Sequence, residues 1–290
     1  MRDGKEIVRV ASYRIGDRET YGVLNGQTVK EASEPFRRRF PDLRSVLAAD
    51  ALALLEADSG GAASALTDID YLPVIPNPDK VICVGVNYLP HIQEWRGEAP
   101  DHPLLFVRFA GSQVGHRQPL VCPAASTMYD FEGELAIVIG RPARHVKRDS
   151  AYNYVAGYCC FMDGTVRDWQ DHTSQFTPGK NFHKSGAMGP HLVTRDEIDD
   201  PTGLRLETRV NGEIMQTGGL DELIFDIPAL IEYCSTFTEL LPGDVIATGT
   251  PGGVGAARNP PRWLASGDRV SVEIDSVGRL ENVVRDASLR

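Results

Sequence analysis

The sequence predicts an α+β fold in which strands dominate. From residue 80 onward, short runs rich in β-branched and apolar residues follow one another, and only 227–237 has the apolar period of a helix. The chain shows neither a regular alternation of strands and helices nor an internal repeat, which argues against Rossmann-type and solenoid folds. With 290 residues, 42% of them hydrophobic, the chain is long enough to bury a full core.

Residues 1–75 are predicted to form a small N-terminal α/β subdomain. The runs 6–15 and 20–33 indicate two or three short strands with a turn at Asn25–Gly26, and 45–57 has a helical pattern. A proline-rich connector, 72–80, then leads to a buried strand at 81–88. We therefore expect a second, larger domain over 76–290.

The larger domain is predicted to hold a series of strands and one clear helix. The expected strands are 103–110, 133–140, 153–163, 191–197, 204–217, 244–250 and 269–275. Asn211–Gly212 is typical of a tight hairpin turn. The helix at 227–237 carries Pro228 near its start, where proline is tolerated.

The charge of the chain favours a small-molecule partner. Its 30 basic and 40 acidic residues give a formal net charge of −10, so composition provides no basic surface for nucleic acid or an anionic membrane. Since no apolar run approaches the roughly 18 residues of a membrane span and the first residues lack the apolar core of a secretion signal, we expect a cytoplasmic protein. The five cysteines form no C-x-x-C pair and are predicted to be reduced core residues: Cys83, Cys122, Cys159, Cys160 and Cys234.

Three carboxylates stand at alternate positions in the stretch 129–140, YDFEGELAIVIG. If this stretch is one strand, Asp130, Glu132 and Glu134 share a face and repel one another. A divalent cation would relieve the repulsion, and ligands that are all oxygen select a hard ion such as Mg²⁺, Mn²⁺ or Ca²⁺. The alternative is a solvated strand face with counter-charges from Arg141 or Arg144.

A second acidic position follows the apolar strand that ends near residue 162. Asp163 precedes a glycine, and Arg167, Asp168 and Gln170 come soon after it. A strand end followed by clustered polar side chains commonly points them into one site.

Five segments, in the same order along the chain, resemble the fumarylacetoacetate hydrolase family. They are the Glu-x-Glu pair with the later aspartate, VGVNYLPHIQE at 84–94, DGTVRDWQ at 163–170, GKNF at 179–182 and LLPGDVIATGTPGGVG at 240–255. Together they cover about 80–286. The resemblance implies a β-roll of mixed sheets, usually a homodimer, and a Mg²⁺ or Mn²⁺ ion on Glu132, Glu134 and Asp163. It assigns no role to Asp130.

The resemblance also implies catalytic roles for four polar residues. His91 and Glu94 match the pair that activates water in acylpyruvase-type members; on their own they could be a surface ion pair. Lys180 would stabilise negative charge on a substrate oxygen, with Lys184 as a nearby competitor. Gln170 would orient water or substrate, unless it is a surface amide.

Substrate contacts are expected around the same site. The glycine-rich loop can bring backbone N–H groups close to a carboxylate, with Gly249 and Thr250 as the expected contacts, or it is a tight connection between strands. The resemblance adds Tyr88 and Arg167 as contacts. Two positions depart from the family pattern. Arg108 stands where many relatives have lysine, and His183 stands where aspartate is common. Arg108 would bind a substrate carboxylate or serve packing.

The expected reaction is metal-dependent hydrolysis of a C–C bond in a 2,4-dioxo acid of the acylpyruvate or fumarylpyruvate type, giving pyruvate and a carboxylic acid. His91, oriented by Glu94, would be the general base. The alternatives are isomerisation or tautomerisation, decarboxylation and hydration of 2-hydroxy-dienoates or oxaloacetate-like acids in aromatic-compound catabolism. A further alternative is a non-catalytic binding protein on the same fold.

Overall fold

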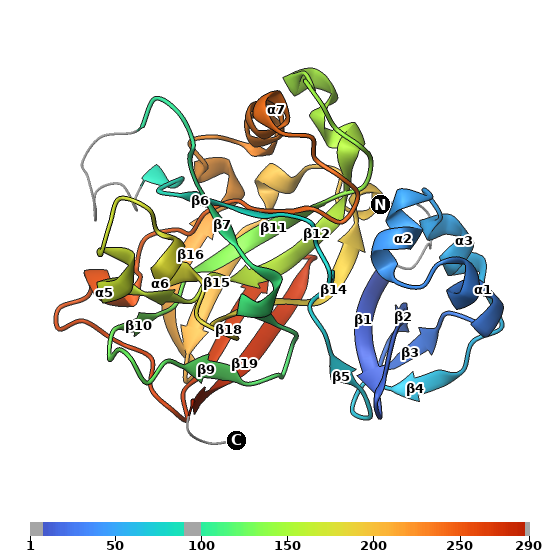
Figure 1. The fold of residues 1–290 in the computed structure, drawn as a ribbon, viewed down its shortest axis with the longest axis horizontal. Coiled ribbons are helices and arrows are strands. Elements are labelled where there is room, and N and C mark those ends of the chain that lie inside the picture. Colours follow the sequence, from blue (N-terminus) through green and yellow to red (C-terminus); the bar gives the residue numbers. More distant parts are fainter. Residues whose placement is uncertain (1–7, 90–99, 288–290) are drawn as a thin grey trace.

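A large mixed sheet forms the centre of the molecule (Figure 1). The computed structural model describes residues 8–89 and 100–287, and within these residues the sheet has twelve strands. In spatial order its main path is β4 (Ala63–Ala65), β3 (Thr28–Glu31), β2 (Arg18–Asn25), β1 (Arg9–Ile15), β14 (Gly186–Thr194), β12 (Val155–Met162), β11 (Gly133–Ile139), β17 (Val245–Ala247), β6 (Val81–Gly85) and β7 (Leu104–Arg108). Two short strands join it at the side, β5 (Asp70–Tyr71) on β1 and β8 (Gln113–Val114) on β14.

A second sheet packs against one face of the first. Its order is β16 (Glu213–Gly219), β15 (Arg205–Val210), β18 (Arg269–Ile274), β19 (Gly278–Asp286) and β9 (Leu120–Cys122). Leu135 and Ile137 of β11 lie in one apolar core with Val272 of β18 and Leu280 of β19. The next residues along β11 point the other way, because side chains alternate along a strand. The strand is therefore buried on both faces over its whole length.

The opposite face of the central sheet is covered by helices from the part of the chain before residue 75, here called the N-terminal module. The helices are α1 (Glu34–Arg39), α2 (Leu43–Ala48) and α3 (Leu52–Ala57). Leu43, Val46 and Leu55 share a core with Ala136 and Val138 of β11. The prediction of one helix over 45–57 is wrong, because the backbone at Asp50 has a φ of 52° that ends α2 before α3 begins.

The N-terminal module is joined to the rest of the sheet by hydrogen-bonded strands. β1 pairs antiparallel with β14, with Arg9 opposite Val193 and Val10 opposite Leu192. The predicted hairpin β2–β3 is present, and Gly26 at its turn has a φ of 55°, which glycine adopts without strain. The division of the chain at residue 75 stays a prediction.

The remaining elements agree with the predicted strand-rich class. The late helix is α7 (Ile227–Phe237), with Asp226 as its N-cap and an apolar face of Ile227, Leu230, Ile231 and Cys234. Asn211–Gly212 forms the hairpin turn between β15 and β16. Two short helices, α5 (Arg167–Gln170) and α6 (Thr177–Lys180), and a two-stranded ribbon of β10 (Tyr129–Asp130) and β13 (Thr165–Val166) were not expected from the sequence.

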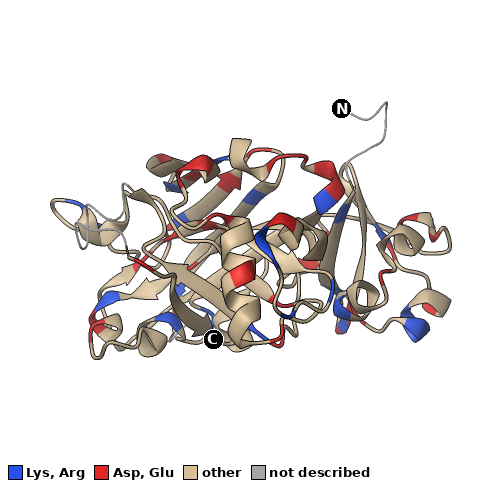
Figure 2. Cartoon of the chain, turned by 90° about the horizontal axis from the view of Figure 1, so that it is seen from above, with Lys and Arg blue, Asp and Glu red and all other residues tan. Residues whose placement is uncertain are grey.

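The cysteines and charges are distributed as the composition suggests. All five cysteines are free, and four of them are buried. Acidic and basic residues are interspersed over the described chain (Figure 2). None of the described helices has the length and apolar character needed to cross a bilayer.

Candidate metal centre and active site

The stretch 129–140 is two strands rather than one. β10 ends at Asp130 and pairs with β13, whereas β11 begins at Gly133 in the central sheet. The prediction of one continuous strand is therefore wrong at Phe131–Glu132, the step between the two sheets. Gly133 packs so closely on β15 that a Cβ there would lie 2.0 Å from Thr208 Oγ1. The chain must change direction at this point to enter the central sheet.

Three of the predicted carboxylates meet at the start of β11 and the end of β12. Glu132, Glu134 and Asp163 each place one carboxylate oxygen within 4.8 Å of the others. Their exposed fractions are 5%, 1% and 0%. The alternative of a solvated strand face is wrong, since Arg141 instead pairs with Asp50 and Arg144 bonds backbone oxygens at Ser235 and Thr236.

Three buried cations surround these carboxylates. Lys180 Nζ lies 2.7 Å from Glu132 Oε2 and 2.6 Å from Asp163 Oδ2. Arg167 Nη2 lies 2.6 Å from Glu132 Oε1, and Arg108 donates to Asp163 Oδ1. Burial lowers the pKa of Lys180, but the charges of Asp163 and Glu132 outweigh it and hold the pKa above its ordinary value. Lys180 is therefore an ammonium.

Arg108 is engaged entirely with protein groups. Besides Asp163, its guanidinium donates to the Gly164 carbonyl at 2.9 Å, to Ser185 Oγ at 2.8 Å and to Ser112 Oγ at 3.1 Å. It is 2% exposed and does not line the cavity described below. Of its two expected roles, this geometry favours packing and support of Asp163.

Glu134 makes no ion pair with a described residue, and the chemistry of the cluster fits a divalent cation there. Burial, followed by the charges of Asp163 and Glu132, raises its pKa well above the ordinary value. When all groups are ionised, four buried carboxylates, counting Asp130, face three buried cations. One divalent cation would reverse the sign of that balance and so favour an anionic substrate. The triad is an all-oxygen donor set, suited to Mg²⁺ or Mn²⁺.

The glycine-rich loop presents N–H groups to protein carboxylates. Gly249 N donates to Glu134 Oε2 at 2.8 Å, and Gly255 N donates to Asp130 Oδ1 at 2.8 Å. Thr250 Oγ1 donates to the Gly133 carbonyl at 2.8 Å and accepts from Gln216 Nε2 at 2.8 Å. The loop thus supports the acidic cluster, and Thr250 also faces the cavity.

A cavity opens beside the acidic cluster. Glu132, Glu134, Lys180, Arg167 and Gln170 line its polar side. The other lining residues are Val84, Gly85, Val86, Phe106, Asp171, Phe176 and Thr250. The aromatic wall, Phe106 and Phe176, could not be identified from the sequence, because neither phenylalanine is marked by a polar motif.

The other predicted site residues lie in different places. His91 and Glu94 fall outside the described residues. Tyr88 is fully buried, and burial followed by the charge of Glu134 raises its pKa, but it does not line the cavity. His183 and Lys184 are exposed and line a separate hollow beside β9. Lys180 is therefore the lysine that reaches the acidic cluster.

Two further polar residues were misjudged or left without a role. Asp168 lies outside the cluster and accepts a hydrogen bond from Ser126 Oγ at 2.6 Å. Asp130, which the sequence left without a role, is fully buried against Arg167. Its position two residues before Glu132, in the same alternating series, was the available signal, but its partners come from distant segments.

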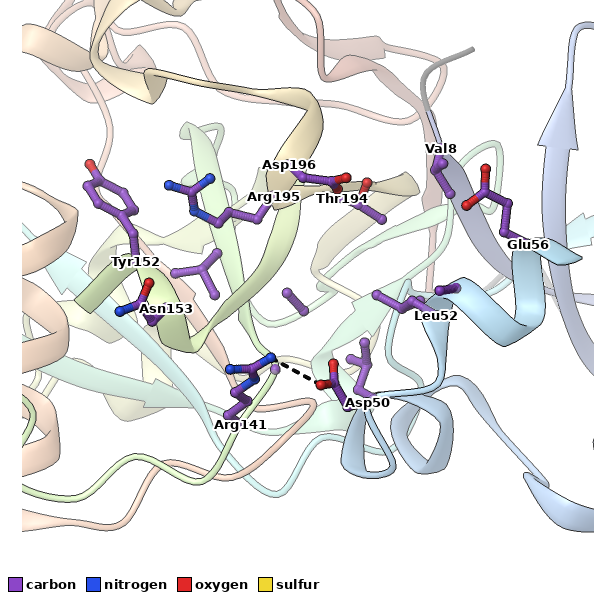
Figure 3. Close-up of a pocket in the computed structure, with 15 residues that line it drawn as sticks. Val8, Asp50, Leu52, Glu56, Arg141, Tyr152, Asn153, Thr194, Arg195 and Asp196 are labelled. Atoms are coloured by element: carbon purple, nitrogen blue, oxygen red, sulfur yellow. Dashed lines mark hydrogen bonds and ion pairs between the residues drawn. The ribbon is translucent and has the colours of Figure 1, made fainter. Parts of the chain in front are cut away.

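A larger cavity, of about 660 Å³, lies between α3 and the 3₁₀ turn Arg148–Tyr154 (Figure 3). Leu52 and Glu56 line one side, Tyr152 and Asn153 the other, and Arg141 pairs with Asp50 between them. No triad residue lines this cavity. Although this cavity is larger, we place the active site beside the acidic triad, because the buried carboxylates and cations converge there.

Comparisons with known proteins agree with this geometry. Residues 80–285 match the sequence profile described as Fumarylacetoacetate (FAA) hydrolase C-terminal. The chain is 41% identical over 220 residues to the mitochondrial oxaloacetate tautomerase FAHD2A of Homo sapiens, covering 75% of this chain and 70% of that protein. Fumarylacetoacetate hydrolase from Exiguobacterium antarcticum superposes with a TM-score of 0.84 at 33% identity, over 96% of this chain and 99% of the other.

A further solved structure is maleylpyruvate hydrolase from Sphingobium sp. SYK-6 in complex with manganese(II) and pyruvate. It has a TM-score of 0.78 and 28% identity, over 96% of this chain and 99% of that one. The order of motifs, the buried acidic triad and these similarities agree, and the chain belongs to the fumarylacetoacetate hydrolase family.

Proposed function

We propose that this protein is a divalent-metal-dependent enzyme that interconverts the enol and keto forms of an oxaloacetate-like 2-oxo diacid. The observation that best supports this proposal is the buried triad of Glu132, Glu134 and Asp163 in a chain 41% identical to an oxaloacetate tautomerase. This is the tautomerase alternative that the sequence left open, and the similarity supports it better than hydrolysis.

The described residues have distinct roles in this proposal. A Mg²⁺ or Mn²⁺ ion held by the triad would act as a Lewis acid toward the 2-oxo acid. The Lys180 ammonium donates to the C2 oxygen as negative charge develops there during loss or gain of the enol proton. Gln170 accepts from Arg167 Nη1 at 3.0 Å through its side-chain oxygen, which leaves its amide nitrogen to donate into the cavity.

Hydrolysis of a C–C bond is the second candidate. Its support is the structural similarity to maleylpyruvate hydrolase, whose structure contains manganese and pyruvate. Hydrolysis needs a base for water, and His91, oriented by Glu94, remains the proposed base. Tautomerisation involves no attack by water and so does not need this base.

Product analysis separates the candidates. The Mg²⁺-loaded protein is incubated with enol-oxaloacetate, acylpyruvates, fumarylpyruvate and a 2-hydroxy-dienedioate, while enol absorbance is followed and products are identified by mass spectrometry. Faster decay of the enol without change in mass supports the tautomerase, whereas pyruvate plus a carboxylic acid supports the hydrolase. Carbon dioxide indicates decarboxylation. Asp163→Ala should abolish each activity.

A thermal-shift experiment tests the non-catalytic alternative. Mg²⁺ should raise the melting temperature, and oxalate, a mimic of the pyruvate enolate, should raise it further when Mg²⁺ is present. Stabilisation by Mg²⁺ with no added effect of oxalate and no turnover favours a binding protein. A homodimer and the cytoplasmic compartment stay predictions, and the human relative is named as mitochondrial.

A further inference from the structure

Asp130 connects two distant segments beside the acidic triad. Its Oδ1 accepts from Gly255 N at 2.8 Å, and its Oδ2 accepts from Ala256 N at 3.0 Å and from Arg167 Nε at 2.9 Å. The side chain is fully buried and does not line the cavity. One carboxylate thus holds both the end of the glycine-rich loop and the guanidinium of α5.

Arg167 connects Asp130 to two groups of the active site, Glu132 and Gln170. With Nε fixed by Asp130, Nη2 lies 2.6 Å from Glu132 Oε1 and Nη1 donates to Gln170 Oε1 at 3.0 Å. Because a guanidinium is a rigid planar fork, fixing one edge also fixes the direction of the others. The orientation of a proposed metal ligand and that of a cavity amide therefore depend on the same contact.

The loop is shaped to accommodate this carboxylate. A Cβ on Gly255 would lie 2.5 Å from Asp130 Oδ1 and 2.0 Å from the Arg262 carbonyl oxygen. Glycine at 255 allows its N–H and that of Ala256 to reach Asp130 together.

We propose that Asp130 is a positioning residue, which acts through Arg167 to hold Glu132 for the metal and Gln170 for the substrate. The proposal rests on the proposed function for its substrate but not for its metal-affinity part. Groups that orient metal ligands are commonly worth about 10- to 100-fold in affinity or activity.

The central test is Asp130→Asn. The asparagine oxygen can still accept from Gly255, but its amide nitrogen would face the donors of Arg167 and Ala256. We expect Mn²⁺ affinity, measured by titration calorimetry, to fall about 10-fold or more in a folded variant, and kcat to fall more than KM rises. The matched control is Asp244→Asn. Asp244 is also fully buried, and its carboxylate accepts hydrogen bonds from Leu241 N, Lys80 N and Lys80 Nζ. It lies at the opposite end of β17 from Gly249.

A double-mutant cycle with Arg167→Lys tests whether Asp130 acts through Arg167. Lysine keeps the charge but cannot contact Asp130, Glu132 and Gln170 as a fork. In the Arg167→Lys background, Asp130→Asn should change Mn²⁺ affinity by less than about 2-fold, because the guanidinium that links Asp130 to Glu132 is already absent. If Asp130→Asn does not fold, Arg167→Lys alone should still show the loss of Mn²⁺ affinity.

The proposal is overturned if Asp130→Asn lowers only the melting temperature, as Asp244→Asn is expected to do. It is likewise overturned if the two changes multiply independently, or if Arg167→Lys binds Mn²⁺ like the wild type. Failure of the wild type to turn over any 2-oxo acid would refute the proposed function. The calorimetric results would still decide the role of Asp130, because they need no substrate.

Discussion

Gly249 N donates a hydrogen bond to Glu134 Oε2 at 2.8 Å, although the two residues lie 115 positions apart in the chain. The bond joins the glycine-rich loop to the carboxylate that no described cation pairs with. It is possible because Gly249 has a φ of 103°, where other residues are strained.

Gly249→Ala should therefore weaken both the fold and the metal site. Its Cβ would lie 2.8 Å from Asn87 Cβ, in addition to a backbone strain of about 1–3 kcal/mol for a non-glycine residue at positive φ. Gly267→Ala is the matched control, since Gly267 has a φ of 96° and its Cβ would meet nothing within 4 Å. We expect both variants to lose stability in urea, with the larger loss and about 10-fold weaker Mn²⁺ binding only for Gly249→Ala. Equal metal affinities would refute this role of the loop.

Lys180→Met should remove the cation that faces the substrate oxygen. Loss of a donor to developing negative charge typically lowers kcat about 10²- to 10³-fold. The change also leaves Glu132 and Asp163 without a shared partner, so the metal-free variant should unfold at lower urea concentration. Lys184→Met, at an exposed lysine in the same segment, is the control and should keep wild-type kinetics. A rate loss of the same size in both variants would argue against Lys180.

His91→Ala should separate the two candidate reactions. If His91 is the base that activates water, the variant loses C–C hydrolysis but keeps enol–keto interconversion. Both activities are measured on the same preparation, by pyruvate release and by enol absorbance. C–C cleavage that persists in His91→Ala would disprove its assignment as the base.

The stability of the protein should fall with acid in part through His191. Burial, followed by the charge of Arg9, lowers its pKa to about 4 from an ordinary value of 6.5, and Nε2 lies 2.9 Å from the Val277 carbonyl oxygen. The unfolded chain takes up the proton first, so the contribution of neutral His191 is complete above pH 6.5 and disappears as the pH falls toward 4.

The shift corresponds to at most about 3 kcal/mol in the free energy of unfolding. Urea unfolding of the wild type and of His191→Gln between pH 7 and pH 4 measures it. The variant should lose less stability over this range; parallel curves for the two proteins would contradict the assignment.

Most strands could be predicted from local sequence, because a strand's apolar pattern lies in consecutive residues. The metal triad was predicted from the resemblance to a family, since Asp163 is distant in sequence from the Glu132–Glu134 pair. Glu132 and Glu134 stand beside a wholly apolar run, and Asp163 ends another, so burial and strand ends place them together. The break between β10 and β11 was not predictable from the stretch itself, because the two strands pair with different partners, β13 and β12, that come later in the chain. Asp130 was missed for the same reason, because its partners are 37 and 125 positions away.

The pairing of β1 with β14 also bears on aggregation. All nine residues of β14 are buried, and β1 pairs with the end of β14 at Leu192 and Val193. Removing residues 1–75 would leave this end of β14 as an open edge, which is a template for pairing with other chains. The region that matches the family profile begins at residue 80, so expressing it alone would leave this edge uncapped. We therefore expect the isolated 80–285 region to associate more readily with other chains than the full chain does.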